Sequence, residues 1–232
     1  MNKIPLLVIV FTALTMFFSA CGSDKGSSAD DKSNEKVDVK SSADDKSNEK
    51  VDVKQGSFVD SRDGKSYKTV FLGDQEWMAE NLNYAIAGSY CYDGLDENCT
   101  EFGRLYSWYE AQEVCPEGWH LPTDEEWNLM LDFVGGKEVA GRKLKSASGW
   151  ENDLKGDRCN GLDSYGFSVK PSGNCAFDNV CLGTFFAEFW SNKSHGTTSA
   201  YYWSFSFSTD SVLYYDGEYR GNLKSVRCLK NN

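Results

Sequence analysis

The sequence predicts an α+β domain from residue 58 onward, because one well-capped helix stands between segments with the alternation of β-strands. Thr123 and Glu126 have the spacing of a helix capping box, and apolar side chains follow at helical intervals. These side chains are Trp127, Met130, Leu131 and Val134. Gly135-Gly136 is expected to end the helix. The last third is β-rich, with strands expected at 188–191, 201–207, 211–215 and 223–229.

The other elements follow from local turn and periodicity signals. Gly73-Asp74 between two alternating runs is typical of a hairpin. The expected order is a turn-rich entry at 58–64, a strand at 66–72, its partner at 75–78, a strand or helix entry at 104–108, a short helix at 109–114, a weaker second helix at 138–146 and a long polar loop at 150–172.

The N-terminal segment has the features of a secretion signal. Residues 1–20 carry one early positive charge, at Lys3, then an apolar run and small residues before Cys21. Ser19-Ala20-Cys21-Gly22 resembles a bacterial lipobox, in which the cysteine is acylated. We therefore expect an exported lipoprotein with palmitate-type chains on Cys21, held in the outer membrane, since Gly22 and not Asp follows the cysteine. The domain would then face the periplasm or the cell surface. The alternative is ordinary cleavage that leaves Cys21 free.

A duplicated segment follows the signal. Residues 27–40 read SSADDKSNEKVDVK, and residues 41–54 repeat them without one change. Neither copy contains an aromatic residue, so folding would bury too little apolar surface to offset the lost conformational entropy. We expect residues 21–57 to form a disordered tether that spans about 35 Å as a flexible coil.

Charge and aromatic content narrow the range of partners. The chain has a formal net charge of −11 at pH 7 and contains 7 Trp and 12 Tyr. An acidic protein repels phosphate backbones, so nucleic acid is not an expected partner. The aromatic residues can supply both a core and exposed binding surfaces.

Sequence motifs spread over the whole domain are similar to those of one known family. They are DSRDGKSYKTVFLGDQEWMAENLNY (60–84), FGRLYSW (102–108), CPEGWHLPTDEEW (115–127), YGFS (165–168), FWS (189–191), AYYW (200–203) and SVRC (225–228). These segments resemble the Fibrobacter succinogenes major paralogous domain, which is distantly similar to the formylglycine-generating-enzyme and C-type-lectin-like folds. The resemblance implies an α+β architecture with a twisted antiparallel sheet, two helices and long loops. It brings no established activity.

The resemblance also suggests how the cysteines pair. Cys115 and Cys228 match in position the long-range disulfide of C-type-lectin-like folds, and an exported protein oxidises thiols that can meet. Two further pairs would each close a short loop, which leaves Cys159 as an odd thiol. The expected pairs are Cys115–Cys228, Cys91–Cys99 and Cys175–Cys181. The alternative is that some of these thiols are reduced and buried.

The long polar loop offers oxygen ligands for a metal ion. Asp153, Asp157, Asn160 and Asp163 lie among glycines, and hard oxygen ligands on a flexible backbone suit Ca²⁺. Ca²⁺ is thus the one cofactor that the sequence suggests. The spacing is not that of an EF-hand, and a solvated acidic loop is the alternative.

Catalysis is the second class of function to consider. The resemblance leaves room for an enzyme of unknown chemistry on the formylglycine-generating fold, but that chemistry uses two cysteines near the chain end, where this sequence has only Cys228. His120 and His195 are the only histidines, and His120 lies in a turn where a packed structural role is expected. No common catalytic or phosphate-binding motif is present. These observations favour a binding protein over an enzyme.

The residues expected to carry binding are tyrosines of the C-terminal strands. Alternation turns one face of a strand inward and the other outward, and exposed tyrosines stack on sugars and anchor protein interfaces. Trp190 and Trp203 are expected in the core. The candidate ligand-binding residues are Tyr202, Tyr214, Tyr215 and Tyr219, beside the 153–163 loop. The expected ligand is a glycan, a cell-wall polymer or a protein; purely structural display is a further alternative.

Overall fold

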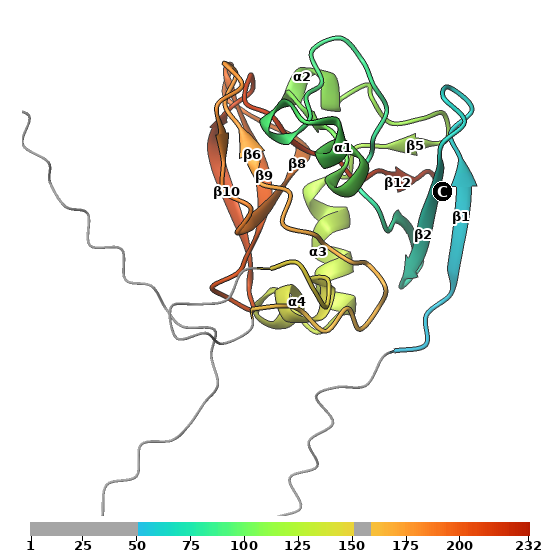
Figure 1. Cartoon of the computed structure of the whole chain (residues 1–232). Coiled ribbons are helices and arrows are strands. Elements are labelled where there is room, and N and C mark those ends of the chain that lie inside the picture. Colours follow the sequence, from blue (N-terminus) through green and yellow to red (C-terminus); the bar gives the residue numbers. More distant parts are fainter. Residues whose placement is uncertain (1–50, 151–158) are drawn as a thin grey trace, which may run out of the picture.

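The computed structural model describes residues 51–150 and 159–232, which form two five-stranded β-sheets with helices between them (Figure 1). The predicted signal, Cys21, most of the predicted tether and residues 151–158 of the long loop lie outside the described residues. The fold is mixed α+β with mainly antiparallel pairing, as predicted. The expectation of one sheet is wrong, because the strands divide between two.

The first sheet contains the predicted hairpin. Its order is β1 (Gln55–Val59), β2 (Ser66–Leu72), β3 (Gln75–Met78), β12 (Leu229–Lys230) and β5 (Trp119–His120). Gly73 turns the chain between β2 and β3 with φ of 62°, a conformation that glycine adopts without steric cost. At the outer edge, Gln55 pairs with Val70 and Val53 packs against the core. Ordered structure therefore starts before residue 58, inside the segment predicted as tether.

The second sheet is built from the C-terminal third of the chain. Its order is β10 (Val212–Tyr219), β9 (Ser199–Ser206), β8 (Phe186–His195), β11 (Lys224–Ser225) and β4 (Leu105–Tyr106). A small hairpin, β6 (Asn174–Cys175) with β7 (Cys181–Leu182), lies beside it. β10, β9 and β8 are consecutive antiparallel strands, so the alternation seen in the sequence corresponds here to two distinct faces.

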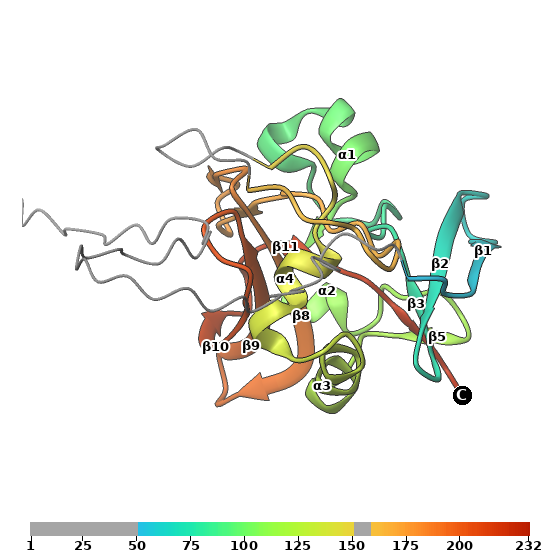
Figure 2. The ribbon, with the colours of Figure 1, turned by 90° about the horizontal axis from the view of Figure 1, so that it is seen from below.

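The end of the chain links the two sheets. The segment predicted as one strand at 223–229 is split, because β11 pairs with β4 and β8 in the second sheet and β12 pairs with β3 and β5 in the first. Figure 2 shows the chain crossing from β11 to the C-terminus between the sheets. The crossing places Val226, Arg227 and Cys228 in the interior, each 2% exposed or less.

The three helices predicted from the sequence are present, and one further helix was not predicted. The helices are α1 (Asp96–Phe102), α2 (Trp108–Ala111), α3 (Asp124–Phe133) and α4 (Lys137–Leu144), with a 3-10 turn at Tyr92–Gly94. The Thr123–Glu126 capping box of α3 is formed, as predicted. The loop expected between Cys91 and Cys99 instead contains the start of α1, whose first-turn acids Asp96 and Glu97 suit the positive end of the helix dipole.

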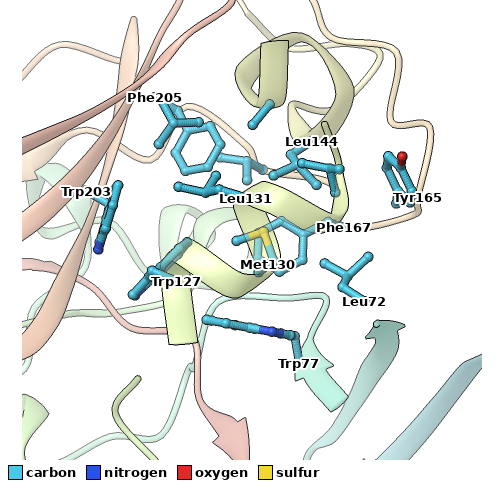
Figure 3. Close-up of a cluster of buried hydrophobic side chains, with 14 of the residues drawn as sticks. Leu72, Trp77, Trp127, Met130, Leu131, Leu144, Tyr165, Phe167, Trp203 and Phe205 are labelled. Atoms are coloured by element: carbon cyan, nitrogen blue, oxygen red, sulfur yellow. The ribbon is translucent and has the colours of Figure 1, made fainter. Parts of the chain in front are cut away.

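The main core lies on α3, between the two sheets. Trp127 of α3 lies 4.9 Å from Trp77 of the first sheet and 5.9 Å from Trp203 of the second, measured between ring centroids. Figure 3 shows Trp203 and Phe205 on one side of α3, and Trp77 and Leu72 on the other. Trp190 is also buried, in a second cluster against α2, so both tryptophans predicted as core residues are in the core.

The three predicted disulfides are present. Cys115 and Cys228 join the approach to α3 to the end of the crossing segment, over a sequence separation of 113. The other two bonds, Cys91–Cys99 and Cys175–Cys181, close short loops. Cys159 is not a free thiol, so the prediction of an odd thiol there is wrong.

Candidate ligand-binding surface

The four candidate tyrosines lie on β9 and β10 but not on one face. In the register of these strands Tyr215 pairs with Tyr202, whereas Tyr214 pairs with Trp203. Directly opposite residues share a face, and consecutive residues point to opposite faces. The predicted grouping of all four tyrosines in one site is therefore wrong. Because Trp203 contacts Trp127 of α3, the Tyr214 side is the inner face of the sheet.

The outer face carries a stacked pair of tyrosines. The rings of Tyr202 and Tyr215 lie 5.2 Å apart with an interplanar angle of 21°. Trp190 lies beneath, with its ring centroid 6.4 Å from that of Tyr202 in a T-shaped arrangement. Tyr215 is 42% exposed, whereas Trp190 is 1% exposed. A buried tryptophan and a half-buried tyrosine thus support one exposed ring.

A charge cluster lies beside this pair. Lys224, 1% exposed, is ion-paired with Glu188, and its Nζ lies 3.7 Å from Oε2 of Glu218. The same Nζ is 4.1 Å from the ring centroid of Tyr202, a cation–π distance. Burial, followed by the charges of Glu188 and Glu218, raises the pKa of Tyr202, so its hydroxyl stays protonated at neutral pH.

Amide side chains extend the cluster toward the β6–β7 hairpin. Asn174 donates to Glu188 at 2.6 Å, and Asn222 donates to Glu218 at 2.5 Å. The Asn222 oxygen accepts from the backbone N–H of Phe177 at 3.2 Å, and the Phe177 ring lies 5.8 Å from that of Tyr219. Phe177 and Tyr219 are 68% and 48% exposed. We call Tyr202 and Tyr215 the aromatic face; Phe177 and Tyr219, which pairs with Ser199, form a second exposed pair that contacts the cluster through Asn222.

The sequence prediction missed Phe177, Lys224 and Glu188. Phe177 lies in a short loop closed by Cys175 and Cys181, where the polar residues Asp178 and Asn179 that follow it were a usable signal of exposure. Lys224 and Glu188 come from segments far apart in the chain and meet only because β11 runs beside β8. No local pattern indicates that pairing.

Tyr214 is held in a different environment. Its hydroxyl donates to Asp124 at the start of α3, and its ring stacks on Tyr201 with centroids 5.2 Å apart. Asp124 also accepts from Ser191 at 2.5 Å and forms an ion pair with Lys193 at 3.1 Å. Burial and the Asp124 carboxylate raise the pKa of Tyr214. These contacts connect the second sheet to α3.

Two of the four predicted calcium ligands, Asn160 and Asp163, belong to the described residues. Asp153 and Asp157 lie outside the described residues. Asn160 accepts from the backbone N–H of Trp150 at 3.0 Å, and Asp163 accepts from the N–H and hydroxyl of Ser168 at 2.8 and 2.5 Å. In residues 51–150 and 159–232 no group of three or more His, Cys, Asp or Glu is placed to hold a metal ion.

His120 links two parts of the fold. One ring nitrogen lies 2.6 Å from the Asn231 side-chain oxygen, and the other lies 2.9 Å from both carboxylate oxygens of Glu126 in the capping box of α3. Both nitrogens are thus engaged by neighbouring side chains. Cys228, the single cysteine near the chain end, is bonded to Cys115.

These features define a disulfide-stabilised α+β module compatible with binding outside the cell. None of the helices in the described parts of the chain has the length and apolar character needed to cross a membrane. A family model, the Fibrobacter succinogenes major domain, matches residues 70–230, and the chain belongs to this family. No curated protein and no solved structure matches the chain.

Proposed function

We propose that this domain is an extracellular binding module that holds a neutral glycan against the aromatic face. The observation that carries the proposal is the exposed Tyr215 ring, stacked on Tyr202 beside the hydrogen-bonded cluster of Lys224 and Glu188. A tyrosine ring offers a flat apolar surface at small entropic cost, because only two torsions must be ordered. Carboxylate and amide groups at its edge can bond to sugar hydroxyls.

The charge of the cluster favours a neutral ligand over an acidic one. Glu188 and Glu218 carry two negative charges against the single positive charge of Lys224, in a chain of net charge −11. An acidic polymer would meet like charge at this surface. The amides of Asn174 and Asn222 can donate and accept without selecting for charge.

Binding to a soluble neutral hexose oligomer, measured by titration calorimetry, tests the proposal. The purified protein should bind the oligomer saturably, and Tyr202→Ala/Tyr215→Ala should lower the affinity at least tenfold, a loss of about 1.4 kcal/mol. Phe133→Ala is the matched control, since Phe133 is 46% exposed but lies on α3, which packs on the inner side of the second sheet. Equal affinities of the parent and the double variant would remove the aromatic face from the binding site.

We also propose that acyl chains on Cys21 hold the exported domain at the outer membrane. The lipobox-like sequence and the signal before it support this, and a tether would carry the aromatic face away from the lipid surface. Cys21→Ala should move the protein from the membrane fraction to the soluble exported fraction. A variant that still incorporates labelled palmitate would contradict the proposed anchor.

The arrangement of the chain ends supports a distant relation to C-type-lectin-like and formylglycine-generating-enzyme folds, which we propose as the ancestry of this domain. β12 returns to the sheet that contains β1, and Cys115–Cys228 secures this return. An experimental structure in which the last strand lies outside that sheet would contradict the relation.

A further inference from the structure

A second candidate site lies on the first sheet, remote in sequence from the aromatic face. It is a pocket of about 400 Å³, within the size range of small-molecule sites. Four parts of the chain form its wall: the start of β2, residues 79–83 after β3, the end of α1, and residues 166–170. Arg227, from the segment that crosses between the sheets, also lines it.

Arg227 is a buried cation without a carboxylate partner among the described residues. It is 2% exposed, and its three hydrogen bonds go to neutral oxygens: Asn81 Oδ1 at 2.8 Å, the Ser168 carbonyl at 3.1 Å and the Phe167 carbonyl. A guanidinium has five N–H donors, so these bonds do not use all of them. Buried charges are normally paired with an opposite charge, because desolvation is costly.

The nearby acids are already engaged. Asp163 accepts from the N–H and hydroxyl of Ser168, and Glu80 accepts from the backbone N–H of Lys68 at 2.8 Å. Burial lowers the pKa of Arg227, and the charges of Asp163 and Glu80 offset this effect only in part. Among the described residues the guanidinium therefore has hydrogen bonds to neutral oxygens but no direct ion pair with a carboxylate.

The backbone around Arg227 is shaped to hold this arrangement. Ser168 has φ of 51°, in the left-handed region that is uncommon for a residue with a side chain, and the two bonds from Ser168 to Asp163 hold it there. On the opposite wall, a Cβ at Gly103 would come within 2.9 Å of the carbonyl oxygens of Asn81 and Leu82. The close approach of α1 to residues 81–82 thus requires glycine.

The rim of the pocket adds positive charge. Lys65, Lys68 and Lys170 line it and are exposed, against two lining acids, Glu80 and Glu101. Lys65 is partly neutralised by Asp63 at 3.1 Å, whereas Lys170 forms no ion pair among the described residues and donates to the carbonyl oxygen of Glu101 at 3.3 Å. In a chain of net charge −11, this pocket is locally cationic.

We propose that this pocket binds a small hydroxylated monocarboxylate, the class of the sugar acids, with its carboxylate against Arg227 and the lysine rim. A planar carboxylate matches the fork of a guanidinium, and the remaining lining groups, which include Asn83, Ser66 and Thr100, can bond to hydroxyls. The net negative charge of the protein disfavours anions of higher charge. This pocket and the aromatic face are formed by different strands and helices. The pocket is locally positive, whereas the surface beside the aromatic face is locally negative.

The test is a titration of the purified protein with sodium glucuronate, followed by the chemical shifts of backbone amides. Saturable shifts at residues 80–83, 100–103 and 166–170 are expected. Glucose, which lacks the charge, and acetate, which lacks the hydroxyls, should each bind at least tenfold more weakly. Phosphate that binds more tightly than glucuronate, or equal weak shifts with every anion, would overturn the assignment.

Variants distinguish specific binding in this pocket from nonspecific electrostatic attraction of anions to the protein. Arg227→Lys keeps the charge but removes the fork, and we expect about a tenfold loss of glucuronate affinity. Because Arg227 is buried, Lys68→Ala/Lys170→Ala provides a second test on exposed residues, with an expected loss of about threefold to tenfold. Lys137→Ala, an exposed lysine on α4, is the matched control. Loss in the control equal to that in the double variant would overturn the proposal.

Discussion

Tyr214 and Tyr215 are neighbours in β10 with similar exposure, 38% and 42%, yet they belong to different parts of the molecule. Tyr214 is stacked on Tyr201 and bonded to Asp124, so it fastens the sheet to α3. Tyr215 is stacked on Tyr202 and lies on the face turned away from α3. Exposed area alone therefore does not identify a binding residue. The contacts of the rest of the side chain distinguish a structural tyrosine from one available to a ligand.

The largest expected difference between the two faces is in stability. Trp203→Ala should lower the free energy of unfolding by about 3–5 kcal/mol, because it empties a core site against Trp127 and Tyr214. Tyr202→Ala, at the preceding position in β9, should lower the free energy of unfolding by less, since Tyr202 is only partly buried. Urea denaturation of both variants measures the difference. An equal loss in both would mean that the outer face is as much a part of the core as the inner one.

A smaller effect is expected from a buried lysine directly after α4 that contacts the end of β9. Lys145 is 1% exposed and donates to the carbonyls of Ser206 at 2.9 Å and Thr209 at 3.1 Å. Burial lowers the pKa of Lys145 to about 8. Between pH 8 and its ordinary value near 10.5, the unfolded chain binds the extra proton, so the free energy of unfolding should rise with pH.

The rise should be limited to the range between pH 8 and about 10. Above pH 10 the raised pKa values of Tyr202 and Tyr214 act in the opposite sense, because the folded state then keeps protons that the unfolded state loses. Lys145→Met should remove the rise between pH 8 and 9, whose slope is at most about 1.4 kcal/mol per pH unit. Above pH 9 the lowered pKa of Arg227, about 9, contributes a rise of the same sign that the variant keeps. Denaturant unfolding at pH 8, 9 and 10 measures the slope. A rise between pH 8 and 9 that persists in the variant would assign it to another group.

The smallest stability effect should come from the Tyr214 hydroxyl. Tyr214→Phe removes the bond to Asp124 but leaves the carboxylate bonded to Ser191 and Lys193, so we expect a loss of about 1 kcal/mol. Thermal denaturation of the variant beside Tyr215→Phe sharpens the comparison, because the second change should be close to neutral. A larger loss in Tyr215→Phe would reverse the roles assigned to the two residues.

The parts of the fold that the sequence predicts are those with local causes. The capping box at Thr123, the hairpin turn at Gly73 and the apolar stripe of α3 each depend on residues a few positions apart, and the structure contains all three. The pairing of Cys115 with Cys228 came from the family resemblance. The start of α1 was missed because acids and asparagine also favour turns, and only the fold selects between helix and loop.

The binding surface was predicted less well, for reasons of distance along the chain. Tyr214 and Tyr215 were predicted to share one site, but they point to opposite faces of β10, and the sequence does not indicate which face α3 covers. The split of 223–229 between two sheets brings Lys224 to Glu188 and Arg227 to Asn81, and no repeat or spacing indicates it. Both candidate sites therefore depend on one crossing segment that the sequence presents as an ordinary strand.

The most direct test of the central claim is glycan binding by Tyr214→Ala and Tyr215→Ala, measured side by side by titration calorimetry with the neutral hexose oligomer. Circular dichroism at the titration temperature first establishes that both variants are folded. The outer-face account predicts at least a tenfold loss of affinity for Tyr215→Ala and a change within about twofold for Tyr214→Ala. Loss in Tyr214→Ala with retention in Tyr215→Ala would place the ligand on the inner face and contradict the account.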